Sequence, residues 1–100
     1  MTTNLPPKKD ILTIHAKEWF DRTYGNSYFS AYATINGEFA CKIPYEYGYG
    51  EHYKECVHRE LIKLGILDKD HPLEPLWQAC NRLNITLIAD KVSVSRKKDL

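Results

Sequence analysis

Residues 27–45 read SYFSAYATINGEFACKIPY, and this stretch decides the fold because it predicts a β-hairpin. Two runs of alternating apolar and polar residues flank Asn36-Gly37. Alternation with a period of two is typical of half-buried strands. Asn-Gly between such runs favours a two-residue type I′ turn. Alternation places the following residues on the inner faces of the two strands: Phe29, Ala31, Ala33 and Ile35, then Phe39, Cys41, Ile43 and Tyr45.

A third alternating run precedes this hairpin. From Ile11 to Trp19 one face carries Leu12, Ile14 and Ala16. The other face carries mostly polar residues, so the run predicts a further half-buried strand. Residues 21–26 form a loop in which Gly25 and Asn26 tolerate a positive φ. Residues 11–45 therefore predict a three-stranded antiparallel meander.

The remainder of the chain predicts two helices and a fourth strand. Apolar residues at three-to-four spacing from Glu51 to Leu64 indicate a helix, which Gly65 ends as a C-terminal cap. A second, shorter helix begins at Pro72 or Pro75 and buries Leu76, Trp77 and Cys80. Residues 85–94 then form a strand with a turn or bulge at Asp90-Lys91.

The order β-β-β-α-α-β predicts an α+β fold. We expect a four-stranded, mainly antiparallel sheet with two helices packed on one face. A chain of 100 residues suits one domain. We therefore assign residues 1–10 to a flexible N-terminal tail, residues 11–95 to a single domain and residues 96–100 to a basic C-terminal tail.

Composition excludes several classes of protein. A formal net charge of +1 argues against a protein that coats duplex DNA. Three cysteines at irregular spacing do not form a disulfide framework and favour reduced thiols. The N-terminus lacks the apolar core of a signal peptide, and no stretch approaches the roughly 18 apolar residues of a membrane span. We expect a cytoplasmic protein with no membrane association.

Two motifs could carry chemistry, and neither is specific. His52 and Cys56 are four residues apart on the predicted helix and share a face, so a small metal protein or enzyme around them is one alternative. The paired ligands typical of structural zinc sites are absent from the sequence. The segment Tyr47-Gly48-Tyr49-Gly50 precedes a helix but lacks a nucleotide-binding fingerprint. We expect no catalytic residues, no metal and no cofactor.

Aromatic residues concentrate in one part of the chain. Residues 19–53 contain all seven tyrosines, and Tyr, Trp and Arg dominate the hot spots of protein interfaces. The expected binding residues are Trp19, Arg22, Tyr24, Tyr28, Tyr32, Tyr47 and Tyr49. A partner protein is the first interpretation, and a homodimer would cover the same face.

Single-stranded nucleic acid is the alternative partner. Bases stack on aromatic rings that have cations nearby. The residues that could do this on the face away from the helices are His15, Lys17, Trp19, Tyr28 and Tyr32, with Arg22 near them.

Residues 19–28 (WFDRTYGNSY) and 45–50 (YEYGYG) resemble a pattern found in small uncharacterised bacteriophage and prophage proteins. The resemblance covers about the middle third of the chain and names no family. It implies a non-enzymatic accessory protein of a phage or mobile element. Such a protein would act in the host cytoplasm by binding a host protein, for example as an anti-defence inhibitor of the anti-CRISPR kind.

Overall fold

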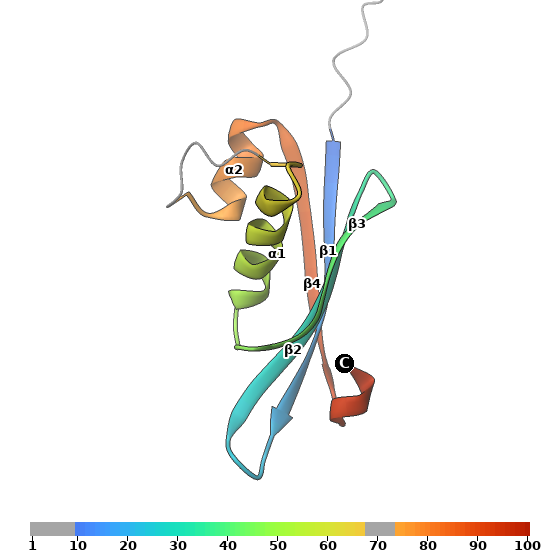
Figure 1. Ribbon diagram of the computed structural model, residues 1–100, viewed down its shortest axis with the longest axis vertical. Coiled ribbons are helices and arrows are strands. Elements are labelled where there is room, and N and C mark those ends of the chain that lie inside the picture. Colours follow the sequence, from blue (N-terminus) through green and yellow to red (C-terminus); the bar gives the residue numbers. More distant parts are fainter. Residues whose placement is uncertain (1–9, 68–73) are drawn as a thin grey trace, which may run out of the picture.

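A computed structural model of the chain describes residues 10–67 and 74–100. The elements follow the predicted order (Figure 1): β1 (Asp10–Asp21), β2 (Asn26–Ile35), β3 (Glu38–Tyr47), α1 (His52–Lys63), α2 (Leu76–Arg82), β4 (Ile85–Val94) and the 3₁₀ helix η1 (Lys97–Asp99). Residues 1–9 of the expected N-terminal tail and Pro72 lie outside the described residues, whereas Asp10, the last residue of that expected tail, begins β1. The segment expected to be a basic C-terminal tail contains η1.

The Asn36-Gly37 turn is confirmed. Asn36 has a φ of 53° and Gly37 a φ of 85°, and two positive values are what a type I′ turn requires. The Asn36 side chain also accepts a hydrogen bond from the Ile11 backbone N–H at 2.9 Å and donates one to the Asp10 carboxylate at 3.0 Å. The turn of the hairpin is thereby fastened to the start of β1.

The C-terminal cap of α1 is confirmed as well. Gly65 has a φ of 77° and its N–H donates to the Ile62 carbonyl at 2.9 Å. The Ile66 N–H donates to the Leu61 carbonyl at 2.9 Å. These two bonds form a Schellman motif, which satisfies carbonyls that the end of a helix would otherwise leave unpaired.

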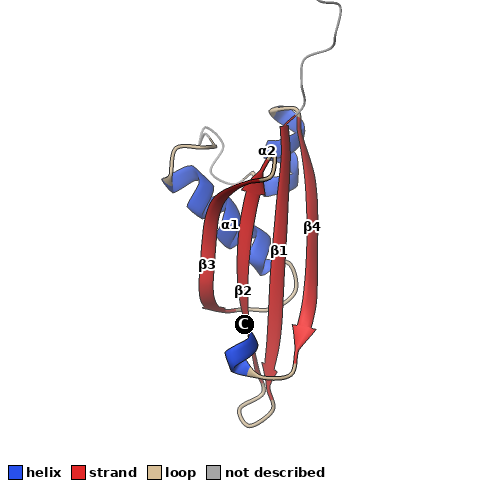
Figure 2. Cartoon of the chain, turned by 90° about the vertical axis from the view of Figure 1, so that its right-hand side faces the viewer, coloured by secondary structure: helices blue, strands red, loops and turns tan. Residues whose placement is uncertain are grey.

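The sheet has the strand order β3-β2-β1-β4 (Figure 2). The β1–β2 and β2–β3 pairs are antiparallel, but β4 runs parallel to β1. The expectation of a mainly antiparallel sheet is therefore wrong, and the sheet is mixed. The chain leaves β3, passes through both helices and returns beside β1, and such a helical crossover joins parallel strands.

The expected turn or bulge at Asp90-Lys91 is absent, because β4 continues through both residues. Asp90 lies opposite His15 and Lys91 opposite Ala16 within an unbroken ladder. Lys91 Nζ lies 2.6 Å from Glu18 Oε2 and donates to the Gly50 carbonyl at 3.0 Å. Lys91 therefore joins β4 to β1 and to the segment that leads into α1.

The core is one cluster between strands and helices. β1 and β2 supply most of its strand residues, α1 covers β1–β3, and α2 lies against β4. Both helices lie to the left of the sheet in Figure 1. The three cysteines are buried and free, as the sequence predicts. The buried members are Leu12, Ile14, Ala16, Phe29, Ala31, Ala33, Cys41, Tyr53, Cys56, Val57, Leu61, Leu67, Leu76 and Cys80.

Two irregularities in β3 contradict the predicted inner face of this strand. The register with β2 shifts between Phe29 and Ala31 and again between Ala33 and Thr34. An extra residue at a bulge reverses the alternation beyond it. Phe39 consequently pairs with Thr34 and is 67% exposed, and Tyr45 stacks on Tyr28 instead of entering the core.

Trp77 is a further correction. It was expected on the buried side of the second helix, but its side chain is 60% exposed. α2 has seven residues and buries Leu76, Ala79 and Cys80. In so short a helix these three positions complete the inner stripe, so the neighbouring Trp77 points outward.

Candidate functional site

The candidate site is the sheet face opposite the core, called the outer face below. Its side chains alternate with the core residues of each strand. Its central members are His15 and Lys17 of β1, Ser30 and Tyr32 of β2, Lys42 and Pro44 of β3, and Asp90 and Val92 of β4. The strand pairing brings these four segments together although β4 is far from the meander in sequence.

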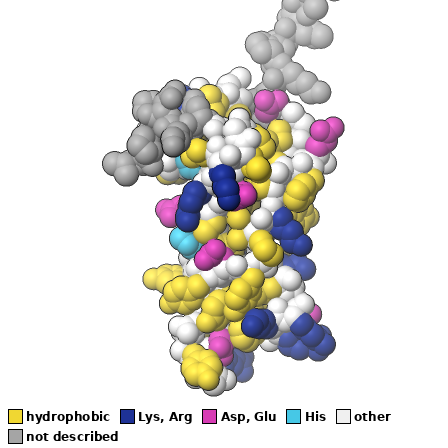
Figure 3. Space-filling model, in the orientation of Figure 1, with side chains coloured by type: hydrophobic (Ala, Val, Ile, Leu, Met, Phe, Trp, Pro, Cys, Tyr) yellow, Lys and Arg dark blue, Asp and Glu magenta, His cyan; other side chains and the backbone are white. Residues whose placement is uncertain are grey.

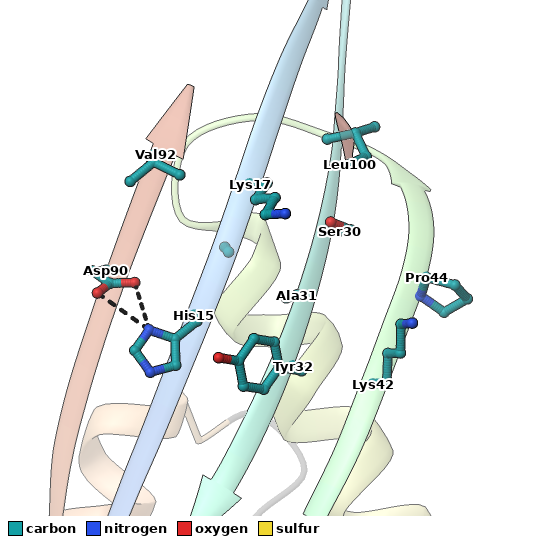
Figure 4. Close-up of a pocket in the computed structure, with 11 residues that line it drawn as sticks. His15, Lys17, Ser30, Ala31, Tyr32, Lys42, Pro44, Asp90, Val92 and Leu100 are labelled. Atoms are coloured by element: carbon teal, nitrogen blue, oxygen red, sulfur yellow. Dashed lines mark hydrogen bonds and ion pairs between the residues drawn. The ribbon is translucent and has the colours of Figure 1, made fainter. Parts of the chain in front are cut away.

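A row of four polar side chains crosses the outer face. The strand registers place Lys42 beside Tyr32, Tyr32 beside His15, and His15 beside Asp90. His15 Nδ1 lies 3.1 Å from Asp90 Oδ1 and 3.2 Å from Oδ2, and the His15 and Tyr32 rings are 5.1 Å apart. Figure 4 shows the row from Asp90 through His15 and Tyr32 to Lys42. Each of the four strands therefore contributes one member.

Beside this row the outer face is hollowed. The hollow has a volume of about 380 Å³ and is flanked by Lys17 on β1 and Lys42 on β3. Among residues 10–67 and 74–100, neither lysine forms an ion pair with a carboxylate. Asp90 also lines the hollow, but it already interacts with His15. The hollow thus has two ammonium groups available to a negatively charged ligand.

An aromatic stack lies further along the same face. Tyr28 is 5.8 Å from Trp19 at an interplanar angle of 26° and 5.1 Å from Tyr45 at 11°. Tyr47 meets Tyr28 edge-on at 5.6 Å, and Lys97 Nζ lies 5.0 Å from the centroid of the Tyr45 ring. Because Trp19 belongs to β1 and Tyr45 to β3, the two rings cover opposite sides of Tyr28.

The structure brings only some of the predicted binding residues together. Trp19, Tyr28 and Tyr47 belong to the aromatic stack, and Tyr32 belongs to the polar row. Arg22 and Tyr24 lie in the β1–β2 turn, where Tyr24 is 78% exposed. Tyr49 is 73% exposed in the segment before α1. The predicted set is therefore divided between the outer face and two separate loops.

Three contributors to the outer face were missing from the prediction. Lys42 could have been found, since it alternates with Cys41 and Ile43. The alternation of apolar and polar residues in β3 does not show the bulge that turns Tyr45 outward. Asp90 depends on the parallel pairing of β4 with β1, which the local pattern does not reveal.

The His52–Cys56 pair forms as the helical spacing predicts. Cys56 Sγ lies 3.5 Å from His52 Nε2, and the His52 ring packs edge-on against Phe29. Burial raises the pKa of the Cys56 thiol, so the thiol stays protonated near neutral pH. Within the part of the chain that the structure describes, no group of three or more His, Cys, Asp or Glu side chains could hold a metal ion. Cys56 is part of the core, whereas the His52 side chain is 38% exposed and lies 3.6 Å from Glu55 Oε2.

The hollow also contains the residue types of a hydrolase triad. Asp90 contacts His15 as the acid of a triad would. Ser30, however, lies opposite Lys17 on β1, and in the described segments no hydrogen bond joins Ser30 to His15. A triad needs that bond, because the histidine must take the hydroxyl proton.

No described helix is long and apolar enough to cross a membrane. A scan against protein-family models found no matching family. Searches of curated proteins and of solved structures returned no significant match. The geometry of the outer face and the resemblance of residues 19–28 and 45–50 are therefore the basis of the functional proposal.

Proposed function

We propose that this protein binds a partner protein through the outer face of its sheet. The observation that carries the proposal is the exposure of large side chains on this face beside Lys17 and Lys42, which form no ion pair with a described residue. Patches of this kind on a small protein mark interaction sites, and tyrosines bury much area with few rotatable bonds. The exposed large residues of the face include Ile11, Tyr32, Phe39, Tyr45, Tyr47, Ile88 and Val92.

We infer that both helices cover the same face of the sheet. The single core cluster supports this, since it joins residues of both helices to the inner residues of the strands. Among residues 10–67 and 74–100, the C-terminal segment lies over part of the outer face: Lys97 lies over the Tyr45 ring and Leu100 lines the hollow. The exposed residues beside this segment are the surface proposed for the partner.

The aromatic stack favours a protein partner over single-stranded nucleic acid. A base binds by stacking on a free ring face. Trp19 and Tyr45 occupy the two sides of the Tyr28 ring, and Lys97 contacts the Tyr45 ring. A partner protein can instead pack against the sides of the rings of Tyr32, Tyr45 and Tyr47, which are exposed residues of this face.

The proposed role is that of a non-enzymatic accessory protein of a phage or mobile element. Its support is the resemblance of residues 19–28 and 45–50 to small phage and prophage proteins. In this role the protein would bind a host protein in the cytoplasm and inhibit or redirect it, as anti-defence proteins do. No catalytic step is part of the proposal.

Affinity capture from nuclease-treated bacterial lysate tests the partner. We expect the wild-type chain to retain a specific protein that the Tyr32→Ala/Tyr47→Ala variant loses, with circular dichroism showing that the variant is folded. Trp77→Ala is the matched control, because it removes an exposed aromatic ring from α2. The captured protein is then identified, purified and mixed with each variant. Equal binding by Tyr32→Ala/Tyr47→Ala would exclude the outer face.

Single-stranded nucleic acid is the second candidate, and the positions of Lys17 and Lys42 beside Tyr32 favour it. Binding through phosphates weakens steeply as salt rises. Fluorescence anisotropy with an oligothymidylate, first at low salt and then at rising salt, measures this directly. Absence of binding at low salt would exclude single-stranded nucleic acid as the partner.

A further inference from the structure

We propose that the hollow between Lys17 and Lys42 receives a carboxylate of the partner, from an Asp or Glu side chain in an acidic segment. The inference rests on the proposed function, because it names the chemistry of the surface that the outer face binds. The polar row, the charge of the hollow and its shape carry the inference.

The charge of the hollow requires a negative partner group. Lys17 and Lys42 project from strands on either side of β2, and neither has an ion-pair partner among the described residues. Asp90 is the only acidic side chain among the described residues that line the hollow, and His15 holds it at 3.1 Å. A partner that covers this face removes water from both ammonium groups, and this desolvation is unfavourable unless the partner supplies anions.

The shape of the hollow suits a single acidic side chain. Its volume of about 380 Å³ lies at the lower end of the range for ligand pockets and is ample for one Asp or Glu side chain. A carboxylate has two acceptor oxygens, which can take hydrogen bonds from an ammonium group and a hydroxyl. Lys17, Lys42 and Ser30 supply such donors, and Pro44 and Val92 provide apolar contacts for the methylenes of a Glu side chain (Figure 4).

The wider charge distribution agrees with an acidic segment. Figure 3 shows several Lys and Arg side chains on the right-hand side, away from the helices in that orientation, while others lie over the centre of the view and acidic side chains lie at the upper right. A nucleic-acid strand crossing the hollow would have phosphates on both sides of it. On the β4 side such a strand would approach the Asp90 carboxylate. An acidic peptide can place its carboxylate between the two lysines and present neutral groups to Asp90.

Nuclear magnetic resonance titration of the labelled full chain tests the inference. The probes are a Glu-rich peptide, the same peptide with Gln in place of Glu, and an oligothymidylate. The variant is Lys17→Gln/Lys42→Gln, and the matched control is Lys63→Gln on α1. We expect the Glu peptide, but not the Gln peptide, to shift the amide signals of Lys17, Tyr32 and Lys42. Affinity should fall about tenfold in the double variant and be unchanged in the control.

Each outcome decides one point. Equal affinity of the double variant for the Glu peptide, or no shift of the hollow signals with this peptide, would overturn the carboxylate site. In either case the capture experiment with Tyr32→Ala/Tyr47→Ala still decides whether the outer face binds a protein. Shifts at the hollow with the oligothymidylate at lower concentration than with the Glu peptide would overturn both proposals in favour of nucleic acid.

Discussion

Replacing Tyr28 with alanine should destabilise the fold, because this ring is the centre of the aromatic stack. Its centroid lies 5.8 Å from Trp19, 5.1 Å from Tyr45 and 5.6 Å from Tyr47. Each such ring pair contributes about 0.5–1.5 kcal/mol beyond the area that it buries. The stack is partly exposed, so the lower half of this range applies, and the free energy of unfolding should fall by about 2 kcal/mol.

Urea unfolding followed by circular dichroism measures this loss. For a domain of this size, 2 kcal/mol corresponds to a decrease in Tm of about 10 °C. Tyr49→Ala is the control, since Tyr49 is 73% exposed and should cost no more than about 0.5 kcal/mol. A double-mutant cycle with Tyr45→Ala isolates the coupling between the two stacked rings, which should be about 1 kcal/mol.

The reasoning would be refuted if Tyr28→Ala and Tyr49→Ala had the same stability. It would also be refuted by a coupling near zero between Tyr28 and Tyr45. This result also affects the choice of variants for binding experiments, because a destabilised Tyr28 variant could lose binding through unfolding. Among the described residues Tyr32 has a ring contact with His15 alone, and it is therefore the better probe of the outer face.

Three further perturbations test other parts of the fold. Gly48→Ala should lower the free energy of unfolding by at least about 1 kcal/mol. A Cβ at this position would lie 2.5 Å from His52 Cδ2, and the backbone φ is 156°. A decrease in Tm no larger than that of an exposed control such as Tyr49→Ala would contradict this. Gly37→Ala should cost about 1 kcal/mol in urea unfolding, since φ is 85° in the type I′ turn; unchanged stability would mean that the turn relaxes without cost. Burial raises the pKa of Cys41 from 9.0 to about 11, so between these values the unfolded chain has lost this proton while the folded chain retains it. Stability should therefore fall as pH rises from 9 towards 11, by up to about 1.4 kcal/mol per pH unit for this thiol. Unfolding measured across this range should show a shallower fall for Cys41→Ala, and an identical slope would exclude the contribution of this thiol.

Much of the fold was predictable because it depends on neighbours in sequence. The Asn36-Gly37 turn needs two residues that accept a positive φ, and Gly65 ends α1 for the same reason. The strands of the meander follow from period-two alternation, and α1 follows from three-to-four spacing. The helical spacing also predicted the contact between His52 and Cys56, in which Cys56 is buried and the His52 side chain is 38% exposed.

The candidate site was predicted only in part. Tyr28 and Tyr32 lie on the outer face as alternation indicated, and Trp19 joins them across the β1–β2 pair. Arg22, Tyr24 and Tyr49 are in loops, whose positions relative to the sheet no periodicity describes. Tyr45 was assigned to the wrong face because one inserted residue in β3 reverses every side chain beyond it.

The sequence by itself determined the local elements of this protein, since turn, strand and helix preferences act over a few residues. Only the tertiary structure decided which elements became neighbours. The parallel pairing of β4 with β1 places Asp90 against His15 across 75 positions, and the register of β3 brings Lys42 to the same hollow as Lys17. Such pairings depend on how the helical crossover packs and where the bulges fall. The proposed anion site therefore exists only in the folded sheet.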